Sequence, residues 1–333
     1  MSHPLFTPRV PARAGTPFLT ARLSRLRVGE IRRLLADMEP DDALIERLAQ
    51  DSRAGVRALA RSLARGQERI HRLDARLDEM LAIERTFCGE GCRCIAGLDE
   101  AGRGPLAGPA TVGCVVLPED ARLPGLDDSK RMTPSAREEM EARIKETARE
   151  WCVVVVSHLE IDELGILGAV LKGMREAVER LALRPDIALV DGNIEPGLVC
   201  RERAIVDGDS RCLSIAAASV LAKVTRDRIM AELDTRWPGY GFAGHKGYGC
   251  RTHVEAIRAH GPCEIHRFSF RPVIEEAPRG AVRSALEARI RNAESAAELD
   301  SVANGIRRAS ERIGEADLDH LREVYRECRK HFA

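Results

Sequence analysis

Apolar residues are spaced differently in three parts of the chain, and each spacing predicts different secondary structure. From Leu26 to about Arg85 they recur every three or four positions, which predicts amphipathic helices without strands. Short apolar runs alternate with helical patterns between about residues 94 and 273. The expected strands are 95–98, 110–117, 153–156, 186–190 and 203–206, and the expected helices are 134–150, 161–183 and 214–234. After about residue 275 the pattern is helical again, with apolar positions at Leu286, Ile290, Leu299 and Leu321.

Strands that alternate with helices are typical of an α/β domain. We therefore expect a Pro-rich disordered segment over 1–20, a helical N-terminal extension over 21–90, an α/β domain over 91–273 and a helical C-terminal extension over 274–333. The length of 333 residues exceeds that of one average domain, which agrees with a core domain that carries additions.

Composition bears on the location of the protein in the cell and on the partners it can bind. The chain has 52 basic and 52 acidic residues, so any surface that binds nucleic acid must be local. It contains neither an apolar run of membrane-spanning length nor the apolar core of a signal peptide near its N-terminus, so we expect a cytoplasmic protein that binds no membrane. Ten cysteines in such a chain are expected to be reduced. Cys88, Cys92 and Cys94 are clustered but lack the spacing of a zinc site, so free thiols are the default and a metal site is the alternative.

Four acidic residues follow strand-like or Gly-rich sequence: Asp99, Glu100, Asp191 and Asp209. Any one of them could be a turn residue or a helix N-cap. Carboxylates gathered at buried strand ends are unfavourable unless a cation lies between them, and Mg²⁺ prefers such oxygen ligands. Two ions about 3.5–4 Å apart can hold the attacking and leaving oxygens of a phosphodiester. Glu100 can share the site with Asp99 only if its strand ends or bends there, because adjacent strand residues point to opposite faces.

Three further segments contain candidate binding residues. The loop Gly102–Pro109 holds three glycines, which would let its backbone approach a ligand closely. Tyr248 lies between glycines and is a candidate for stacking on a sugar or base, whereas Tyr240 is expected to be buried. Lys223 and Arg226 lie on an expected helix and either contact nucleic acid or form a solvated helix face.

These motifs together resemble those of bacterial ribonuclease HII, a type 2 ribonuclease H. The resemblance runs over about 180 residues, through 95–109, 127–130, 190–193, 208–210, 214–227, 240–249 and 266–270. It implies an RNase H-like fold, a mixed central sheet flanked by helices, over 91–273. It also implies an endonuclease, dependent on Mg²⁺ or Mn²⁺, that cuts the RNA strand of RNA–DNA hybrids and single ribonucleotides in duplex DNA. Cleavage 5′ to the ribonucleotide would leave 3′-OH and 5′-phosphate ends, as in DNA replication and ribonucleotide excision repair.

The same resemblance assigns roles to individual residues. Asp99, Glu100, Asp191 and Asp209 correspond to the catalytic, metal-binding acids. The motif that senses the 2′-OH corresponds to Gly102, Arg103 and Gly104, and the tyrosine that stacks at the junction corresponds to Tyr248. Lys130 is expected to contact a phosphate. The partner is then a hybrid or a DNA duplex that contains ribonucleotides, and we expect a monomer.

Two other functions stay open from the sequence. One is a nucleic-acid-binding protein with a degenerate RNase H-like core, and the other is a hybrid nuclease of the ribonuclease HIII type, whose Gly-rich segment differs. The N-terminal extension adds a row of arginines at 53, 57, 61, 65, 69, 72 and 76, opposite an apolar stripe from Val56 to Leu77. This row is either a solvated face or a surface for phosphates. If it binds phosphates, deletion of residues 1–85 should weaken hybrid binding, mostly at higher salt.

Overall fold

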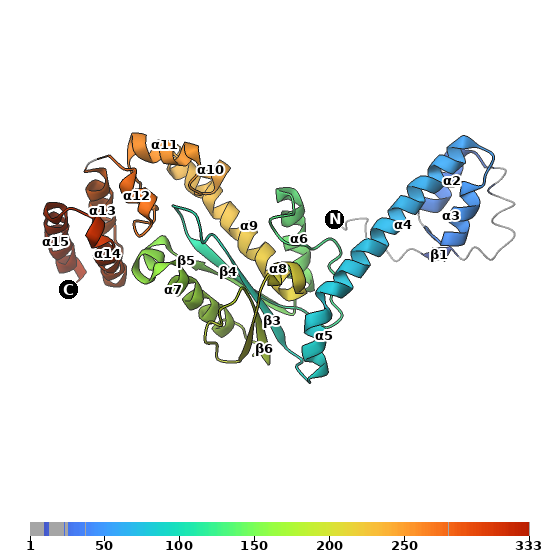
Figure 1. Cartoon of the computed structure of the whole chain (residues 1–333), viewed down its shortest axis with the longest axis horizontal. Coiled ribbons are helices and arrows are strands. Elements are labelled where there is room, and N and C mark those ends of the chain that lie inside the picture. Colours follow the sequence, from blue (N-terminus) through green and yellow to red (C-terminus); the bar gives the residue numbers. More distant parts are fainter. Residues whose placement is uncertain (1–9, 13–22, 24–25, 37, 279, 333) are drawn as a thin grey trace. The chain divides into compact units, whose positions relative to one another are not determined.

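A computed structural model describes residues 10–12, 23, 26–36, 38–278 and 280–332 of the chain (Figure 1). The chain forms two compact units, Met1–Arg76 and Leu77–Ala333. Each unit is described by itself. Among the described residues, no helix is both long and apolar enough to cross a bilayer.

The first unit is a small helical cluster with one short strand pair. Its helices are α2 (Val28–Ala36), α3 (Asp42–Ala49) and the first part of α4 (Ala54–Met80). Its buried core is formed by Leu23, Ile31, Leu35, Leu44, Leu48, Val56, Leu59 and Ala60. Strand β1 (Val10–Ala12) pairs in parallel with β2 (Met38–Pro40). The sequence predicted disorder over 1–20 and no strand after Leu26; three-residue strands are too short to show a two-residue periodicity. The remainder of 1–20 lies outside the described residues.

The long helix α4 differs from the predicted amphipathic helix in its middle. Val56 and Leu59 are buried in the first unit, and Leu77 is buried in the second. Ile70, between them, is 57% exposed. The predicted helix is confirmed, and its apolar stripe is covered at both ends but not at Ile70, because the two ends of this 27-residue helix belong to different cores.

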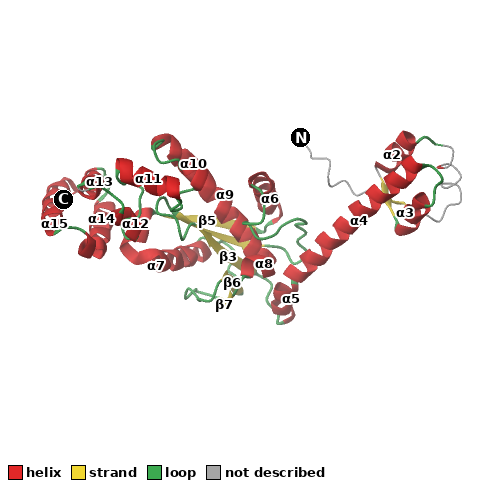
Figure 2. Cartoon of the chain, turned by 45° about the horizontal axis from the view of Figure 1, so that its top comes forward, coloured by secondary structure: helices red, strands yellow, loops and turns green. Residues whose placement is uncertain are grey.

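The second unit is built on a mixed five-stranded sheet (Figure 2). Its strands are β3 (Ile95–Ala101), β4 (Ala110–Val116), β5 (Glu150–Val156), β6 (Ile187–Asp191) and β7 (Arg201–Ile205), in the spatial order β5-β4-β3-β6-β7. Strands β3, β4 and β5 pair antiparallel, whereas β6 and β7 run parallel to β3. This sheet confirms the predicted fold class.

Helices cover both faces of the sheet. Helix α7 (His158–Glu179) packs on β4 and β5, and α9 (Leu213–Arg236) packs on β3 and β4. Gly97 of β3 permits the close approach of α9, because a β-carbon there would overlap the backbone of Ser214. Helices α5 (Ala82–Gly89) and α6 (Pro134–Thr147) complete the α9 side. The short helix α8 (Gly208–Arg211) lies between β7 and α9. After α9 come three more helices, α10 (Phe242–His245), α11 (Arg251–His260) and α12 (Arg271–Glu275).

The C-terminal extension packs on the α/β segment of the same unit. It consists of α13 (Ala281–Arg291), α14 (Ala296–Ala309) and α15 (Glu315–Arg329), with short 3₁₀ turns at Ser310–Arg312 and Lys330–Phe332. Helix α14 packs along α7. The four apolar positions predicted from the sequence, Leu286, Ile290, Leu299 and Leu321, are all buried in a core that also holds Ile257, Phe268 and Val273.

Candidate active site

The order of the strands places three of the predicted acids at one end of the sheet. Asp99 lies near the end of β3, and Asp191 is the last residue of β6, the parallel neighbour of β3. Asp209 lies in α8, and its backbone N–H donates to Oδ1 of Asp191 at 3.2 Å. Asp99 and Asp209 are buried, and Asp191 is half-buried. The fold therefore gathers carboxylates that are 92 and 18 residues apart in sequence, as the motif analysis expected.

Glu100 joins this group near the end of its strand. Strand β3 continues to Ala101, and Glu100 pairs with Val112 of β4. Pairing between β3 and β6 stops at Leu98, so β6 does not flank Glu100. Its carboxylate forms an ion pair with Arg103 at 3.1 Å. The strand ends one residue after Glu100, at Ala101, which agrees with the expectation that it ends or bends near there, and the earlier end of the β6 pairing leaves Glu100 without a β6 partner on that side.

The acids raise one another's pKa. Burial raises the pKa of Asp99 well above its usual range, and the charges of Glu100 and Asp191 raise it further, against a hydrogen bond from Ser219. Burial also raises the pKa of Glu100 and of Asp191. The charge of Asp191 raises the pKa of Glu100 further, and the charge of Asp209 raises that of Asp191. Such mutual repulsion at a protein surface is typical of a site that holds a cation.

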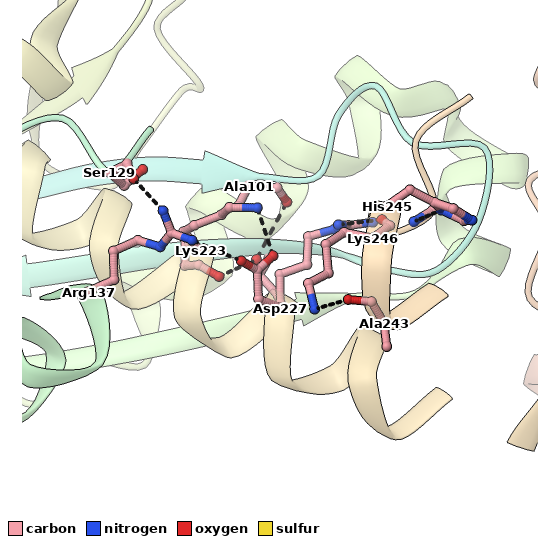
Figure 3. Close-up of polar contacts among 12 residues, drawn as sticks. Ala101, Ser129, Arg137, Lys223, Asp227, Ala243, His245 and Lys246 are labelled. Carbon is pink, nitrogen blue, oxygen red and sulfur yellow. Dashed lines mark hydrogen bonds and ion pairs between the residues drawn. The ribbon is translucent and has the colours of Figure 1, made fainter. Parts of the chain in front are cut away.

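Lys130 provides a positive charge at the same place. Its ammonium group lies 3.1 Å from Oδ2 of Asp209, while its side chain remains 76% exposed. Burial alone would lower the pKa of Lys130, but the hydrogen bond to Asp209 and the charges of Asp209, Asp128 and Asp99 together outweigh this effect, and the pKa is raised. The preceding Ser129 accepts a hydrogen bond from Arg137 at its carbonyl, at 2.8 Å (Figure 3). Its hydroxyl also forms a hydrogen bond with that of Ser219, at 2.9 Å.

Lys223 has neither of the two roles weighed from the sequence. Its ammonium group lies 2.7 Å from Oδ1 of Asp227, one turn later on α9, and both side chains are largely covered. Arg137 of α6 approaches the other oxygen of Asp227 at 3.4 Å (Figure 3). Lys223 therefore takes part in a helix-to-helix ion-pair network that supports the Ser129 loop.

Arg226 was missed by the sequence analysis, which placed it on the helix surface. It is fully buried and donates from Nε to the carbonyl of Pro109 at 2.9 Å, from Nη1 to that of Lys246 at 2.9 Å and from Nη2 to that of Ala107 at 3.3 Å. Arg226 therefore joins the Gly-rich loop to the loop before Tyr248. The spacing along the helix could have indicated this burial. Arg226 lies four residues after Ala222 and four before Met230, on the same helix face as these two apolar residues, which are both buried.

Arg267 holds the same Gly-rich loop from the other side. It is fully buried and donates to the carbonyls of Gly102 at 2.7 Å, Arg103 at 3.0 Å and Gly108 at 3.0 Å. Burial lowers the pKa of Arg267 to about 9 and that of Arg226 to about 10, so both side chains stay charged at neutral pH. Arg267 lies in a motif quoted for the family resemblance, but nothing in the sequence paired it with Gly102.

Tyr248 lies beside the Gly-rich loop and is 46% exposed. A β-carbon on Gly104 would come within 3.5 Å of the Tyr248 ring, so the ring flanks the exposed end of the loop. The structure therefore brings Gly102, Arg103, Gly104 and Tyr248 together next to the acids. Tyr240, which was expected to be buried, is half-buried; its ring stacks on Phe242 at 5.3 Å, and its hydroxyl donates to the carbonyl of Gly261.

Two buried histidines, His253 and His266, support the loop that carries Tyr248. His253 contacts the carbonyl of Tyr248 through Nδ1 at 2.9 Å, and its Nε2 lies 3.1 Å from Nε2 of His266. Burial lowers the pKa of His253 to about 4 and that of His266 to about 3. Both rings are therefore neutral at pH 7, so one ring donates to the other and no buried charge is created.

The donor set of the acids fits a hard divalent cation, since all four residues offer carboxylate oxygens. Among the residues that the structure describes, no three His, Cys, Asp or Glu side chains stand close enough to hold an ion without rearrangement. Cys88, Cys92 and Cys94 are free thiols. They face different cores, because Cys88 and Cys92 pack with Ile95 whereas Cys94 packs on the α7 side of the sheet.

Comparisons with known proteins identify the family of the chain. The family model described as Ribonuclease HII matches residues 96–273, and the model described as Ribonuclease HII N-terminal domain matches residues 27–88. The chain is 47% identical to the ribonuclease HII of Geobacillus kaustophilus over 253 residues, which cover 76% of this chain and 97% of that protein. It is 54% identical to the ribonuclease HII of Geobacter sulfurreducens over 193 residues, 58% of this chain and 89% of that protein.

A solved structure, that of ribonuclease H2 from Pyrococcus horikoshii, aligns with 55% of this chain and 96% of that chain, at 28% identity and a TM-score of 0.48. The curated relatives and the matched models define the class of the protein: it is a ribonuclease H, an endonuclease that hydrolyses RNA in RNA–DNA hybrids. Within that class, the chain belongs to the ribonuclease HII family.

Proposed function

We propose that this ribonuclease H is a divalent-metal-dependent enzyme that also cuts duplex DNA at a single embedded ribonucleotide. The observation that carries the proposal is the continuity of the site. Glu100 links the acids to the Gly-rich loop through its 3.1 Å ion pair with Arg103, and the loop ends against the exposed ring of Tyr248. Phosphate chemistry and ribose recognition would therefore occur side by side.

The recognition half of the site would distinguish RNA from DNA by the 2′-OH, the only group that differs on the sugar. Backbone groups of Gly102, Arg103 and Gly104 would contact this hydroxyl. The half-exposed ring of Tyr248 would pack against the neighbouring deoxyribose or base. Lys130, whose ammonium group already stands among the acids, would contact a phosphate oxygen of the substrate.

The catalytic half would consist of Asp99, Glu100, Asp191 and Asp209, which would hold Mg²⁺ or Mn²⁺. When bound, the metal would lower the pKa of a water and neutralise charge on the phosphate. The four carboxylates would hold the metal where the scissile phosphate lies, and we expect cleavage 5′ to the ribonucleotide, leaving 3′-OH and 5′-phosphate ends. Lys130 would release Asp209 as the site fills, because the same carboxylate cannot serve both cations at full strength.

This activity would place the enzyme in ribonucleotide excision repair and in removal of RNA left by DNA replication. We expect it to act in the cytoplasm as a monomer. The domain limits expected from the sequence are kept in this proposal: catalysis over 91–273, with the extensions 21–90 and 274–333 on either side.

The test is cleavage of a labelled DNA duplex that contains one ribonucleotide, with Mg²⁺ or Mn²⁺ and with EDTA as the control. We expect one product with a 3′-OH end that appears only with metal. Cleavage confined to runs of several ribonucleotides would contradict the proposal and favour the ribonuclease HIII type. Failure to cut any substrate that contains ribonucleotides would contradict it altogether.

A pair of variants tests the metal site within the same assay. Asp209→Asn removes a proposed ligand and should lower cleavage by more than about 100-fold, since even groups that only support a ligand are worth about 10–100-fold. Duplex binding should persist. Asp207→Asn is the matched control, because Asp207 is exposed and its left-handed φ of 55° suits asparagine. Retained turnover in Asp209→Asn would refute the assignment.

A further inference from the structure

Helix α13 of the C-terminal extension sends one arginine into the interior of the second unit. Arg289 is only 6% exposed, and its Nη1 lies 2.8 Å from Oδ2 of Asp162 on α7. Its other nitrogens donate to backbone carbonyls, from Nε to Glu264 at 2.6 Å and from Nη2 to His266. One buried side chain therefore fixes both α7 and the segment 264–266.

Asp162 holds the continuation of that segment. It is 2% exposed and accepts hydrogen bonds from the backbone N–H of Phe268 at 3.1 Å and of Ser269 at 2.8 Å, and from the Ser269 hydroxyl at 2.7 Å. Arg289 thus donates hydrogen bonds to backbone carbonyls just before residue 267. Asp162 accepts hydrogen bonds from backbone N–H groups just after it. Arg267, between the two, has its backbone held on both sides.

The side chain of Arg267 transmits this placement to the recognition loop. Its guanidinium group is held in one position, because it is fully buried and donates to the carbonyls of Gly102 at 2.7 Å and Arg103 at 3.0 Å. Among the described residues every peptide bond is trans, and a trans peptide points its N–H opposite to its C=O. With both carbonyls turned inward to Arg267, the N–H groups of Arg103 and Gly104 face away from it.

We infer that Arg289 is a positioning residue for recognition of the ribonucleotide, acting through Arg267 on the N–H groups of Arg103 and Gly104. This inference rests on the proposed role of Gly102–Gly104. It gives the C-terminal extension a part in substrate selection, although the two matched family models cover only residues 27–88 and 96–273. A single embedded ribonucleotide offers one 2′-OH in one register, whereas a hybrid offers one at every RNA nucleotide. Misplaced N–H groups should therefore impair cleavage of the single ribonucleotide more than cleavage of the hybrid.

The test compares kcat and KM on the two substrates for the full chain and for Arg289→Lys. Lysine keeps a charge for Asp162 but cannot reproduce the planar, multiple contacts of the guanidinium. We expect kcat/KM on the single ribonucleotide to fall about 10-fold or more, the range for misplaced contacts, with a clearly smaller fall on the hybrid. Arg283→Lys is the control, since Arg283 lies on the same helix in a surface ion pair with Asp317.

Thermal unfolding and hydrogen exchange at residues 102–108 accompany the kinetics. A purely structural role would lower stability and reduce both activities in proportion, so an unchanged ratio of the two activities would overturn the inference. If Arg289→Lys does not fold, Ser269→Ala removes one hydrogen bond to Asp162 without a charge change and should move the same ratio by a smaller factor. An unmoved ratio in that variant would also overturn it. If the unaltered chain does not cut at the single ribonucleotide, the proposed function fails instead.

Discussion

A β-carbon on Gly102 would overlap the Nε and Cδ atoms of Arg226. Gly102 also has a φ of +95°, which residues with side chains rarely adopt. Gly102→Ala should therefore displace the loop and lower the unfolding temperature by several degrees, as expected for a loss of about 1–2 kcal/mol in a unit of this size. Thermal unfolding with and without the substitution measures this.

Gly104→Ala is the control for that experiment. A β-carbon there would meet only the Tyr248 ring, at an ordinary contact distance of 3.5 Å. Its unfolding temperature should stay close to that of the unaltered protein. Equal destabilisation by the two substitutions would contradict the role given to Arg226.

The acids should make the metal-free protein less stable as the pH rises. Burial and the charges of Glu100 and Asp191 raise the pKa of Asp99 above its value in the unfolded chain. The folded state then binds this proton more tightly than the unfolded state, so stability is lost as pH rises from about 4 through the raised pKa. Asp99→Asn should remove this loss and raise the free energy of unfolding at pH 7 by at least about 1 kcal/mol, the equivalent of one pKa unit.

Urea unfolding in EDTA at pH 4 and pH 7 measures the effect, and the two proteins should differ less at pH 4. Exposed Asp120 provides the control substitution, Asp120→Asn, which should change stability little at either pH. Lower stability of Asp99→Asn at pH 7 would show that the carboxylate is favourable in the empty site.

Lys130→Ala should weaken substrate binding without unfolding the protein. The side chain of Lys130 is 76% exposed, and an exposed ion pair contributes at most about 1 kcal/mol to stability. Loss of one phosphate contact should reduce the slope of log Kd against log salt by about 1, to a similar extent for all sequences. Lys172→Ala is the control, since Lys172 on α7 is likewise an exposed lysine in an ion pair, with Glu160. An unchanged slope would exclude a phosphate contact.

Tyr248 should act through its ring. Tyr248→Ala should lower affinity by about 1–3 kcal/mol, the range for one aromatic ring stacked on a base. Tyr248→Phe keeps the ring and should bind nearly as well as the unaltered protein. Binding titrations with an uncut duplex, using Asp209→Asn as the background, separate affinity from turnover. A large loss in the phenylalanine variant would instead indicate a role for the hydroxyl.

The arginine row of α4 must be tested with a shorter deletion than the sequence suggested. Arg53 and Arg57 donate to backbone carbonyls within the first unit, including Leu26 at 2.6 Å and Ser52 at 2.6 Å, so they have structural roles. Arg61, Arg65 and Arg69 are exposed and remain candidates for phosphate contacts. Deletion through residue 85 would also remove Glu84, which is buried and accepts from the backbone N–H of Ser214 at 2.9 Å.

Deletion of residues 1–76 avoids that damage, because the second unit begins at Leu77. If the row binds phosphates, affinity for a hybrid should fall most at low salt, not at higher salt as expected from the sequence, because counterion release contributes most to binding when salt is dilute. The salt dependence should also become shallower. The pair Arg61→Gln and Arg65→Gln in the full chain should reproduce part of this loss. Arg322→Gln and Arg326→Gln, on exposed positions of α15, form the matched control. Identical salt dependence in all four proteins would exclude the binding role.

Local pattern was enough to predict most of the fold and the motifs of the site. Periods of two and of three to four residues arise from backbone geometry, so the main strands and helices of the second unit could be located from apolar spacing. The four acids, the Gly-rich loop and Tyr248 could be selected because each lies in a short, unusual stretch of sequence. Where local signal was weak, as in the three-residue strands β1 and β2, the elements were not predicted.

What the sequence by itself determined was thus the set of elements, the family and the acids that are candidates for the metal site. Only the tertiary structure decided which distant residues support them. Arg267 binds the carbonyl of Gly102 across 165 residues, and Arg289 meets Asp162 across 127. The local sequence around a helical arginine does not show whether its side chain faces water or binds backbone carbonyls. The distinction comes from burial, and burial arises only when α7, α9 and α13 pack around the sheet and its loops.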